Sequence, residues 1–428
     1  FQYIYLNRTS ICKIIKEVQK MIFVEYFSKG ESHSDGNASL LALLIKKYSN
    51  ETFYVFCSFV HFECLKNILQ TSNIPVDNIQ FHNIETYPEK YEYSRFFIDF
   101  KLVKQIFDFA KKNNEKKIFS TYTTTLFLYY LKLFLLLNPS IFVITTIHSE
   151  LERLYILKYS NGFNGLRKYF TILYCIFFGL YLPLSINLKN YKCLVYGESI
   201  KQNLLKKVPL LKSNTVIAIN HPYITNSIES TEPFKHGKVN FGLIGLIDKK
   251  KNGTNLLKLL QILKEQNTNK FKISFIGHIR NKMTEEYLGE ALKFDFVERA
   301  SDGPEFISRK LRDELETKVD YNIYTYNIDG YKLTASGAFM DAISFEKPVI
   351  AIKNDFFEYY FNKFGNIGYL FDNINDMAKK MIEITANPNE EEYFIQKENI
   401  KTIKRYIDIN YISNSKDFYN KDEDKDDH

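Results

Sequence analysis

The sequence predicts an α/β protein of two domains, each a parallel sheet wound with helices. At 428 residues the chain is too long for one ordinary core and long enough for two domains of about 150–200 residues. Short apolar runs rich in β-branched and aromatic residues alternate with longer segments of helical periodicity, which is typical of a doubly wound sheet. A polar, proline-containing stretch interrupts this alternation near the middle of the chain, as a linker between domains would.

The composition is that of a globular protein. Hydrophobic residues make up 45% of the chain and charged residues 25%, which excludes a disordered chain. The five cysteines form no CxxC pair and show no metal-ligand spacing, so a reducing cytosol is favoured. The net charge of +7 suits an anionic partner. The chain contains only nine arginines, spread thinly, and we expect no nucleic-acid partner.

The N-terminal domain is expected over residues 21–213. Near-continuous apolar runs are typical of parallel strands buried on both faces. Such runs are IFVEYF (22–27), TFYVFCSF (52–59), KKIFSTY (116–122), FVITTIH (142–148) and KCLVYG (192–197). Helical patterns follow the first strand over 38–47 and the third strand at TLFLYYLKLFLLL. Residues 1–20 are expected to be an N-terminal extension before Met21, with a packed surface helix as the alternative.

Residues 214–238 are expected to be the linker, and residues 239–388 a second Rossmann-like domain. Its predicted strands are VNFGLIGLI (239–247), KISFIGH (272–278), FDFVERA (294–300), YNIYTYN (321–327), KPVIAIKN (347–354) and GYLF (368–371). A C-terminal helix over 389–415 is predicted to return to the N-terminal domain. Residues 416–428, with six acidic residues and little apolar surface, are predicted to be a disordered tail.

The most informative stretch is YKLTASGAFMDAISFEKPVIA, residues 331–351. Ser336 and Gly337 stand at a predicted helix start, where free backbone N–H groups and the helix dipole favour a diphosphate. Gly337 lets the backbone approach a ligand closely. One helical turn later, Asp341 can accept hydrogen bonds from sugar hydroxyls. An ordinary N-cap is the alternative reading of the Ser-Gly pair.

The run DAISFEKPVIA, from Asp341 to Ala351, resembles the E-A-M-A-x-G-K-P-V-I-A segment of the nucleotide-sugar glycosyltransferases called glycosyl transferases group one. The wider stretch is similar to divergent members common in bacterial capsule, exopolysaccharide and lipopolysaccharide assembly. The resemblance implies the GT-B fold, in which two Rossmann-like domains face each other across a cleft. It also implies a nucleoside-diphosphate sugar as the donor.

In that family, two glutamates eight positions apart contact the donor sugar and the nucleotide ribose. Asp341 stands at the second glutamate, which is a conservative departure. Leu333 stands at the first, where the charge is lost. We expect Lys332 or a nearby backbone group to make the missing contact.

Two further segments resemble parts of the family's donor site. FGLIGLIDKKKNGTNLLKLL (241–260) is similar to the G-R-L-x-x-x-K-G-x-x-x-L-L loop, whose arginine and lysine clamp the donor phosphates. Gly245 fits the first glycine, Leu246 replaces the arginine and Lys251 stands at the lysine. A cation there offsets the negative charge of the leaving nucleotide, although a solvated lysine loop is the alternative. The strand KISFIGHI and the loop ASDGPEFI are expected to lie beside the base, through His278 and Phe306.

Two loops of the N-terminal domain are expected to bind the acceptor, because ligands bind beyond the carboxyl ends of parallel strands. The loop SKGESHSDGN (28–37) supplies Gly30, Ser32, Ser34, Asp35 and Asn37, together with His33. The second loop, TTIHSELE (145–152), supplies His148 and Glu150. A neutral histidine can accept the proton of the acceptor hydroxyl, so His148 and His33 are the candidate bases. His33 as base suits inversion, whereas the resemblance favours retention; His221 is interpreted as structural.

Neither a metal nor another cofactor is expected, because GT-B enzymes usually supply the needed charge from the protein. The most apolar run is 164–188, of which 169–188 is uncharged. We interpret it as a helix at the surface of an anionic membrane, with a buried helix as the alternative. The expected location is cytoplasmic. Peripheral contact of the protein with the inner face of the plasma membrane stays open as part of this expectation.

Together these features predict transfer of a sugar to a saccharide or lipid-linked acceptor in surface polysaccharide synthesis. Two alternatives stay open. A GT-B-fold sugar epimerase would need no acceptor site. A catalytically inactive GT-B scaffold would bind saccharide or partner enzymes, and Leu333 and Leu246, which replace charged residues of the family pattern, favour it.

Overall fold

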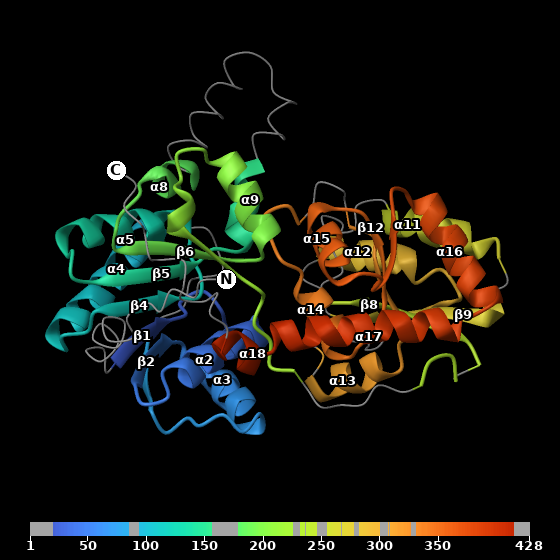
Figure 1. Cartoon of the computed structure of the whole chain (residues 1–428), viewed down its shortest axis with the longest axis horizontal. Coiled ribbons are helices and arrows are strands. Elements are labelled where there is room, and N and C mark those ends of the chain that lie inside the picture. The colour runs from blue at the N-terminus through green and yellow to red at the C-terminus, as the bar shows by residue number, and fades with distance from the viewer. Residues whose placement is uncertain are drawn as a thin grey trace, which may run out of the picture. The chain divides into compact units, whose positions relative to one another are not determined.

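The structure, a computed structural model, describes residues 20–84, 94–155, 179–225, 232–235, 237–245, 255–266, 268–277, 282–299, 307, 309–326 and 331–414. The chain divides into two compact units (Figure 1). Unit 1 comprises Phe1–Ile224 and Ile409–His428, and unit 2 comprises Thr225–Asp408. A parallel sheet with interleaved helices forms each unit, which confirms the predicted α/β fold.

The unit 1 sheet has seven parallel strands in the order β3-β2-β1-β4-β5-β6-β7. The strands are β1 (Lys20–Val24), β2 (Thr52–Cys57), β3 (Ile79–Asn83), β4 (Lys117–Ser120), β5 (Phe142–Thr146), β6 (Tyr191–Tyr196) and β7 (Val216–Ile219). Because all strands are parallel, their carboxyl ends lie at one edge of the sheet. The loops that follow β1, β5 and β6 therefore lie at the same edge.

Two helices of unit 1, α3 (Phe59–Thr71) and α5 (Thr125–Leu137), are capped by side chains that are favoured at this position. Ser58 accepts a hydrogen bond from His61 N, and Thr124 accepts one from Phe127 N. The helical elements are α2 (Ser34–Lys47), α3 (Phe59–Thr71), α4 (Ser94–Lys112), α5 (Thr125–Leu137), η1 (Ser149–Tyr155), α8 (Tyr181–Ser185), α9 (Glu198–Lys207), η3 (Ser213–Thr215) and α18 (Ile409–Asn414).

The C-terminal segment consists of two helices, where the sequence predicted one over 389–415. The first, α17 (Glu390–Ile407), lies within unit 2, and the second, α18, packs against α2 of unit 1. Lys46 Nζ donates to Asn410 Oδ1 at 2.7 Å, and Lys47 Nζ donates to Ser413 O at 2.9 Å. The chain therefore changes units at Asp408.

The predicted linker begins too early. Val216–Ile219 forms β7, which pairs in parallel with β6 at the edge of the unit 1 sheet. Only four residues long and flanked by polar and proline-containing segments, this strand reads as linker in the sequence. The boundary between the units lies at Ile224 and Thr225. Of the remainder of the predicted linker, 226–231 and 236 lie outside the described residues.

The unit 2 sheet has six parallel strands in the order β10-β9-β8-β11-β12-β13. They are β8 (Val239–Ile244), β9 (Phe271–Ile276), β10 (Val297–Arg299), β11 (Tyr321–Tyr324), β12 (Val349–Ile352) and β13 (Gly368–Phe371). The other helical elements are α11 (Asn255–Lys264), η4 (Thr268–Lys270), α12 (Lys282–Ala291), α13 (Arg309–Thr317), α14 (Gly337–Ser344), α15 (Asp355–Phe364) and α16 (Ile374–Ala386).

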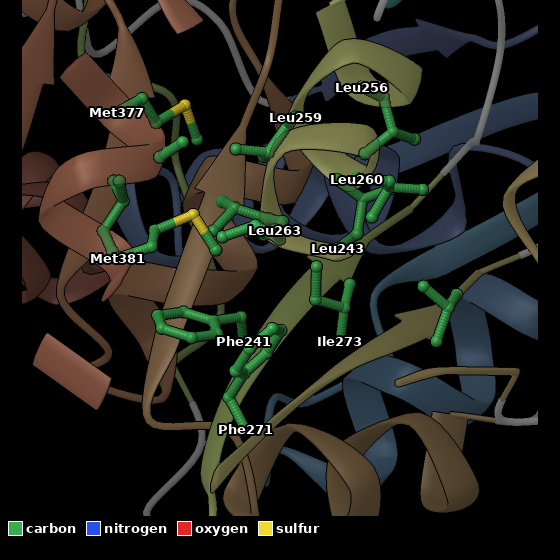
Figure 2. Close-up of a cluster of buried hydrophobic side chains, with 14 of the residues drawn as sticks. Phe241, Leu243, Leu256, Leu259, Leu260, Leu263, Phe271, Ile273, Met377 and Met381 are labelled. Carbon is green, nitrogen blue, oxygen red and sulfur yellow. The ribbon is translucent and has the colours of Figure 1, made fainter. Parts of the chain in front are cut away.

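Two helices and two central strands form the main core of unit 2 (Figure 2). Leucines of α11 and methionines of α16 pack with side chains of β8 and β9; those labelled in Figure 2 are Phe241, Leu243, Leu256, Leu259, Leu260, Leu263, Phe271, Ile273, Met377 and Met381. In α11 the buried leucines recur at helical spacing, so one face of the helix is apolar. This packing fixes α11 relative to the carboxyl ends of the strands.

In the part of the chain that the structure describes, no helix combines the length and apolarity needed to span a bilayer. The predicted membrane-surface segment 164–188 lies mostly outside the described residues, which resume at Gly179. Its last part contains α8, which packs against α5.

Candidate functional site

Three backbone segments of unit 2 meet at the carboxyl edge of its sheet. Gly245 follows β8 in a left-handed conformation (φ 86°), and its N–H donates to Ile276 O at 2.8 Å. A Cβ added to Gly277, which follows β9, would lie 1.7 Å from Gly245 O. A Cβ on Gly245 would lie 3.3 Å from the Cβ of Ala338, in the first turn of α14. The ends of β8 and β9 and the start of α14 therefore converge where there is little side-chain volume.

Helix α14 begins as the sequence predicted. Ser336 is its N-cap, and the hydroxyl accepts a hydrogen bond from Phe339 N at 3.3 Å. The Ser336 hydroxyl also lies 3.2 Å from the hydroxyl of Tyr326 and is 1% exposed. Gly337 is exposed, and an added Cβ there would meet nothing within 4 Å. Ser336 thus fixes the helix start, while the backbone of Gly337 is at the surface.

One turn later, Asp341 lies beside the guanidinium of Arg312, a residue that the sequence did not predict at this site. Arg312 Nη1 of α13 is 4.0 Å from Asp341 Oδ1. The same guanidinium lies 3.6 Å from Asp313 and 3.8 Å from Glu316. The i,i+4 spacing of Arg312 and Glu316 is visible in the sequence, but the contact between two helices is not. Asp341 can therefore accept ligand hydroxyls only while sharing this guanidinium.

The position of the absent family glutamate is closed to a ligand. The side chain of Leu333 is 1% exposed, whereas its neighbour Lys332 is partly exposed. Tyr331, in a left-handed conformation (φ 58°), stacks on Tyr326 with ring centroids 4.3 Å apart. The leucine thus belongs to the core beneath this turn.

The remainder of the DAISFEKPVIA run holds the fold together. Glu346, at the glycine of the family pattern, has φ 56° and pairs with Lys404 (3.0 Å) and Lys397 (3.7 Å) of α17. Lys347 Nζ donates to Thr317 O at 2.8 Å, and burial lowers the pKa of this lysine to about 8. Neither side chain is available to a ligand in this arrangement.

Three other predicted donor residues, Lys251, His278 and Phe306, lie outside the described residues. After the first of these segments, the chain resumes at Asn255, whose Nδ2 donates to Thr325 O at 3.2 Å, just beyond β11. This bond anchors the start of α11 at the same edge of the sheet.

In unit 1, a buried carboxylate organises the turn after β1. Glu25 is 1% exposed, and its Oε1 accepts hydrogen bonds from Phe27 N (2.7 Å) and Ser28 N (2.8 Å). Its Oε2 accepts from Asn37 Nδ2 at 2.8 Å and from the hydroxyl of Thr121. The sequence reading placed Glu25 inside a strand and missed this role; a carboxylate directly after an apolar run was the available signal.

A second buried side chain, His61, continues the network. It is fully buried; Asn37 Nδ2 lies 3.1 Å from its Nε2, and its Nδ1 lies 2.7 Å from Gly30 O. If Nδ1 donates to the carbonyl, Nε2 is left to accept from the amide. Glu25, Asn37 and His61 therefore hold the turn that carries Gly30.

The predicted acceptor loop 28–37 is shorter than expected. Helix α2 begins at Ser34, so Ser34, Asp35 and Asn37 lie in its first turn, and Ser34 and Asn37 are buried. Polar residues suggested a loop, but here they bond within the protein: Ser34 Oγ donates to Glu31 O at 2.9 Å. Gly30 and Ser32 remain in the turn, and exposed His33 is the N-cap with φ 56°.

Two histidines lie beside Tyr196, at the end of β6, and His33 is near one of them, His221. The Tyr196 ring lies 5.6 Å from that of His148 and 4.2 Å from that of His221. Burial lowers the pKa of His221 to about 4, and the nearby His33 lowers it further. Nδ1 of His221 lies 3.0 Å from Pro222 O. His221, interpreted from sequence as structural, therefore shares one region with both predicted bases.

Glu150, which was predicted to bind the acceptor, has its side chain inside unit 1. Its side chain is 6% exposed and accepts a hydrogen bond from the Tyr122 hydroxyl at 2.7 Å. Across the described ranges, no three His, Cys, Asp or Glu side chains are grouped so as to hold a metal ion.

No protein-family model matches the chain, and no curated protein sequence matches it. Solved structures match nearly its whole length. A glycosyltransferase from Rickettsia africae is 15% identical, with a TM-score of 0.58 over 93% of this chain and 96% of that one. Anabaena HepE in complex with UDP-glucose is 12% identical, with a TM-score of 0.60 over 92% and 97% of the two chains. WaaG, a glycosyltransferase involved in lipopolysaccharide biosynthesis, is 9% identical, with a TM-score of 0.57 over 92% and 98%.

At these identities the likeness is one of fold. The two parallel sheets match those of solved glycosyltransferases across both units, with more than nine-tenths of each chain covered. The chain therefore has the GT-B fold of the nucleotide-sugar glycosyltransferases that its sequence resembles.

Proposed function

We propose that the chain is a glycosyltransferase that moves a sugar from a nucleoside-diphosphate sugar to a saccharide or lipid-linked acceptor in surface polysaccharide synthesis. The observation that carries this proposal is the meeting of Gly245, Gly277 and the start of α14 at one edge of the unit 2 sheet. A diphosphate fits where glycines leave the backbone N–H groups uncovered by side chains and where a helix presents the positive end of its dipole. The UDP-glucose bound to HepE supports a donor of this class.

In the proposed donor site, the backbone of Gly245 and Gly337 contacts the diphosphate, and Ser336 holds the helix start in place. Lys251 supplies positive charge to the leaving nucleotide. Asp341, steadied by Arg312, and Lys332 contact the ribose or the sugar. His278 and Phe306 are proposed to contact the nucleotide base.

In unit 1, His148 or His33 is proposed to accept the proton of the attacking hydroxyl. The turn that Glu25 and His61 hold would contact the acceptor through Gly30 and Ser32. We expect transfer to continue after chelation of divalent cations. The proposed location is cytoplasmic, with peripheral contact through 164–188 at the inner face of the plasma membrane.

The buried side chain of Leu333 favours a second candidate, a scaffold of the same fold that binds nucleotide without turnover. Incubating the protein with a panel of nucleotide sugars, with and without acceptors, separates the candidates by mass spectrometry. A glycosylated product supports the transferase. An altered donor sugar formed without acceptor would identify an epimerase instead, and tight binding without any product would identify the scaffold.

The donor site is tested with two glycine variants. A methyl group on Gly337 or on Gly289 of α12 meets nothing within 4 Å, so both variants should fold normally. Only Gly337→Ala places its methyl where the diphosphate is proposed. We expect it to weaken nucleotide binding about tenfold or more, measured by calorimetry, while Gly289→Ala binds as the wild type does. If the two variants bind nucleotide with equal affinity, the diphosphate does not bind at the start of α14.

A further inference from the structure

The outer face of α5 in unit 1 is apolar and exposed. Leu133, Leu136 and Leu137 are 49%, 61% and 71% exposed. The helix, TLFLYYLKLFLLL, has one charged residue, Lys132. That lysine is 1% exposed; its Nζ donates to Ile186 O and lies 4.3 Å from the centre of the Tyr191 ring. The only charge of α5 therefore points into the unit, and none is left on its outer face.

Helix α4 extends this surface, since it packs beside α5 (Figure 1). Phe96, Phe97 and Phe100 at its N-terminal end are 54%, 65% and 39% exposed. The rings of Phe96 and Phe100 each lie 5.4 Å from that of Tyr130 in α5. The α4–α5 apolar face is thus continuous, and it consists of Phe96, Phe97, Phe100, Leu133, Leu136 and Leu137.

Basic residues accompany this face. The exposed charged residues of α4 from Lys101 onward are four lysines and one aspartate: Lys101, Lys104, Asp108, Lys111 and Lys112. A helix with aromatic residues at one end of its exposed surface and lysines along the remainder matches the interface of an anionic membrane. An apolar patch of this kind is uncommon on a protein with no partner.

The end of the most apolar run of the sequence, 164–188, lies against α5. Helix α8 belongs to the uncharged run 169–188 and packs against α5. Ile186, which follows α8 and accepts the hydrogen bond from Lys132, is 38% exposed. The described end of that run therefore adds to the apolar surface around α5.

We propose that the α4–α5 apolar face docks on an anionic lipid surface, with its phenylalanines and leucines at the boundary between headgroups and acyl chains and the α4 lysines among the headgroups. Unit 1 then contacts the membrane through this face. This inference adds a described surface to the peripheral contact proposed through 164–188. It is independent of the proposed transfer reaction, because docking requires neither donor nor acceptor. A lipid-linked acceptor would be met at that surface.

Co-sedimentation of the full chain with vesicles tests the docking without any nucleotide sugar. Vesicles of phosphatidylcholine mixed with phosphatidylglycerol should bind the protein, vesicles of phosphatidylcholine alone should bind it less, and added salt should weaken binding. We expect the double variant Leu133→Ser, Leu136→Ser to bind at least about tenfold more weakly. Its control is Phe394→Ser, Ile395→Ser in α17 of unit 2, where the exposed fractions are 47% and 52%.

Circular dichroism and the thermal midpoint show whether both double variants are folded; if the leucine variant is not, Leu137→Ser alone, at the most exposed position, takes its place. Wild-type protein that stays in the supernatant with anionic vesicles overturns the proposal. So does a folded leucine variant that binds as tightly as the control. A dimer in solution that the leucine substitutions dissociate would assign the face to a second copy of the chain instead. None of these outcomes depends on transferase activity, so the two proposals fail separately.

Discussion

At the turn after β9, the packing leaves no room for a side chain on Gly277. A Cβ there would lie 1.7 Å from the carbonyl oxygen of Gly245 and 2.6 Å from its carbonyl carbon. Both are backbone atoms, and Gly245 N–H donates a hydrogen bond to Ile276 O. The clash with an added Cβ can therefore be relieved only if the two turns separate. We expect Gly277→Ala to lower the free energy of unfolding of unit 2 by about 3 kcal/mol, measured by urea denaturation. Gly289→Ala is the control, and equal stability of the two variants would contradict this packing.

His221 should make unit 1 sensitive to acid. Burial lowers the pKa of His221 to about 4, whereas an unfolded histidine has a pKa of about 6.5. Between these values the unfolded chain binds more protons than the folded one. The contribution of neutral His221 is therefore complete above about pH 6.5 and is lost as the pH falls towards 4.

The shift corresponds to roughly 3 kcal/mol. The free energy of unfolding of the wild type should fall between about pH 7 and pH 4. In His221→Gln, which cannot titrate at this position, we expect that fall to be smaller by up to roughly 3 kcal/mol. Urea unfolding of both proteins at several pH values measures the difference. Parallel pH profiles would mean that the imidazole is not desolvated as the structure indicates.

The residues that sequence patterns locate well are those whose signals are local. Ser336 was found at a helix start because that role depends on neighbouring residues. Gly245 was singled out only through the family loop it resembles, and the predicted strand 239–247 ran past it, whereas β8 ends at Ile244. Glu25 and His61 were missed because their partners are distant in sequence: Thr121 is 96 residues from Glu25, and Gly30 is 31 residues from His61. Only the fold brings these groups together.

At the scale of elements, ion pairs of Glu346 connect the end of α14 to α17. Its left-handed backbone costs about 1 kcal/mol, and its half-buried contacts with Lys397 and Lys404 offset part of that cost. Glu346→Gln keeps the backbone and loses the charge, so we expect a loss of about 1 kcal/mol at low salt. Hydrogen exchange in α17 should become faster.

Glu346→Gly is the matched comparison. It removes the same ion pairs but suits the left-handed conformation, so it should be less destabilising than Glu346→Gln. Denaturant unfolding of the two variants at low and high salt measures the balance. If the glycine variant is the less stable of the two, the backbone at this position is not under strain.

Errors in element boundaries have a common physical cause. Polar residues suggested a loop through Asn37, yet α2 starts at Ser34 because Asn37 bonds to buried Glu25 and Ser34 bonds to Glu31. A single C-terminal helix was predicted, yet α17 ends at Ile407 and Asp408 accepts a hydrogen bond from Thr225 at 3.0 Å. In both cases a hydrogen bond to a residue distant in the sequence, Asn37 to Glu25 or Thr225 to Asp408, lies at the helix end.

At the scale of the whole molecule, the fold class was predictable because the alternation of strands and helices repeats along the chain and tolerates individual errors. The two strands absent from the prediction, β3 and β7, are the edges of the unit 1 sheet. Their residues are only partly buried. β3 (IQFHN) lacks the continuous apolar pattern of central strands, and β7 (VIAI) has it over only four residues, so the sequence signal is weak at both edges of this sheet.

The return of the chain to unit 1 gives the last prediction. Ile409 and Ile412 of α18 are 3% and 4% exposed, and the helix packs against α2, where Lys46 and Lys47 bond to it. Deleting residues 409–428 should cost unit 1 about 4 kcal/mol, roughly 2 kcal/mol for each buried isoleucine.

Unit 2 should keep its stability in that variant, because Thr225–Asp408 remains intact. Hydrogen exchange measured by mass spectrometry follows the two units separately in one sample. Peptides of α2 should exchange faster in the truncated chain, whereas peptides of α11 and α16 should be unchanged. Deleting only residues 415–428 is the control, since it retains α18. Equal loss of protection in both units would show that α18 stabilises the whole chain rather than unit 1 alone.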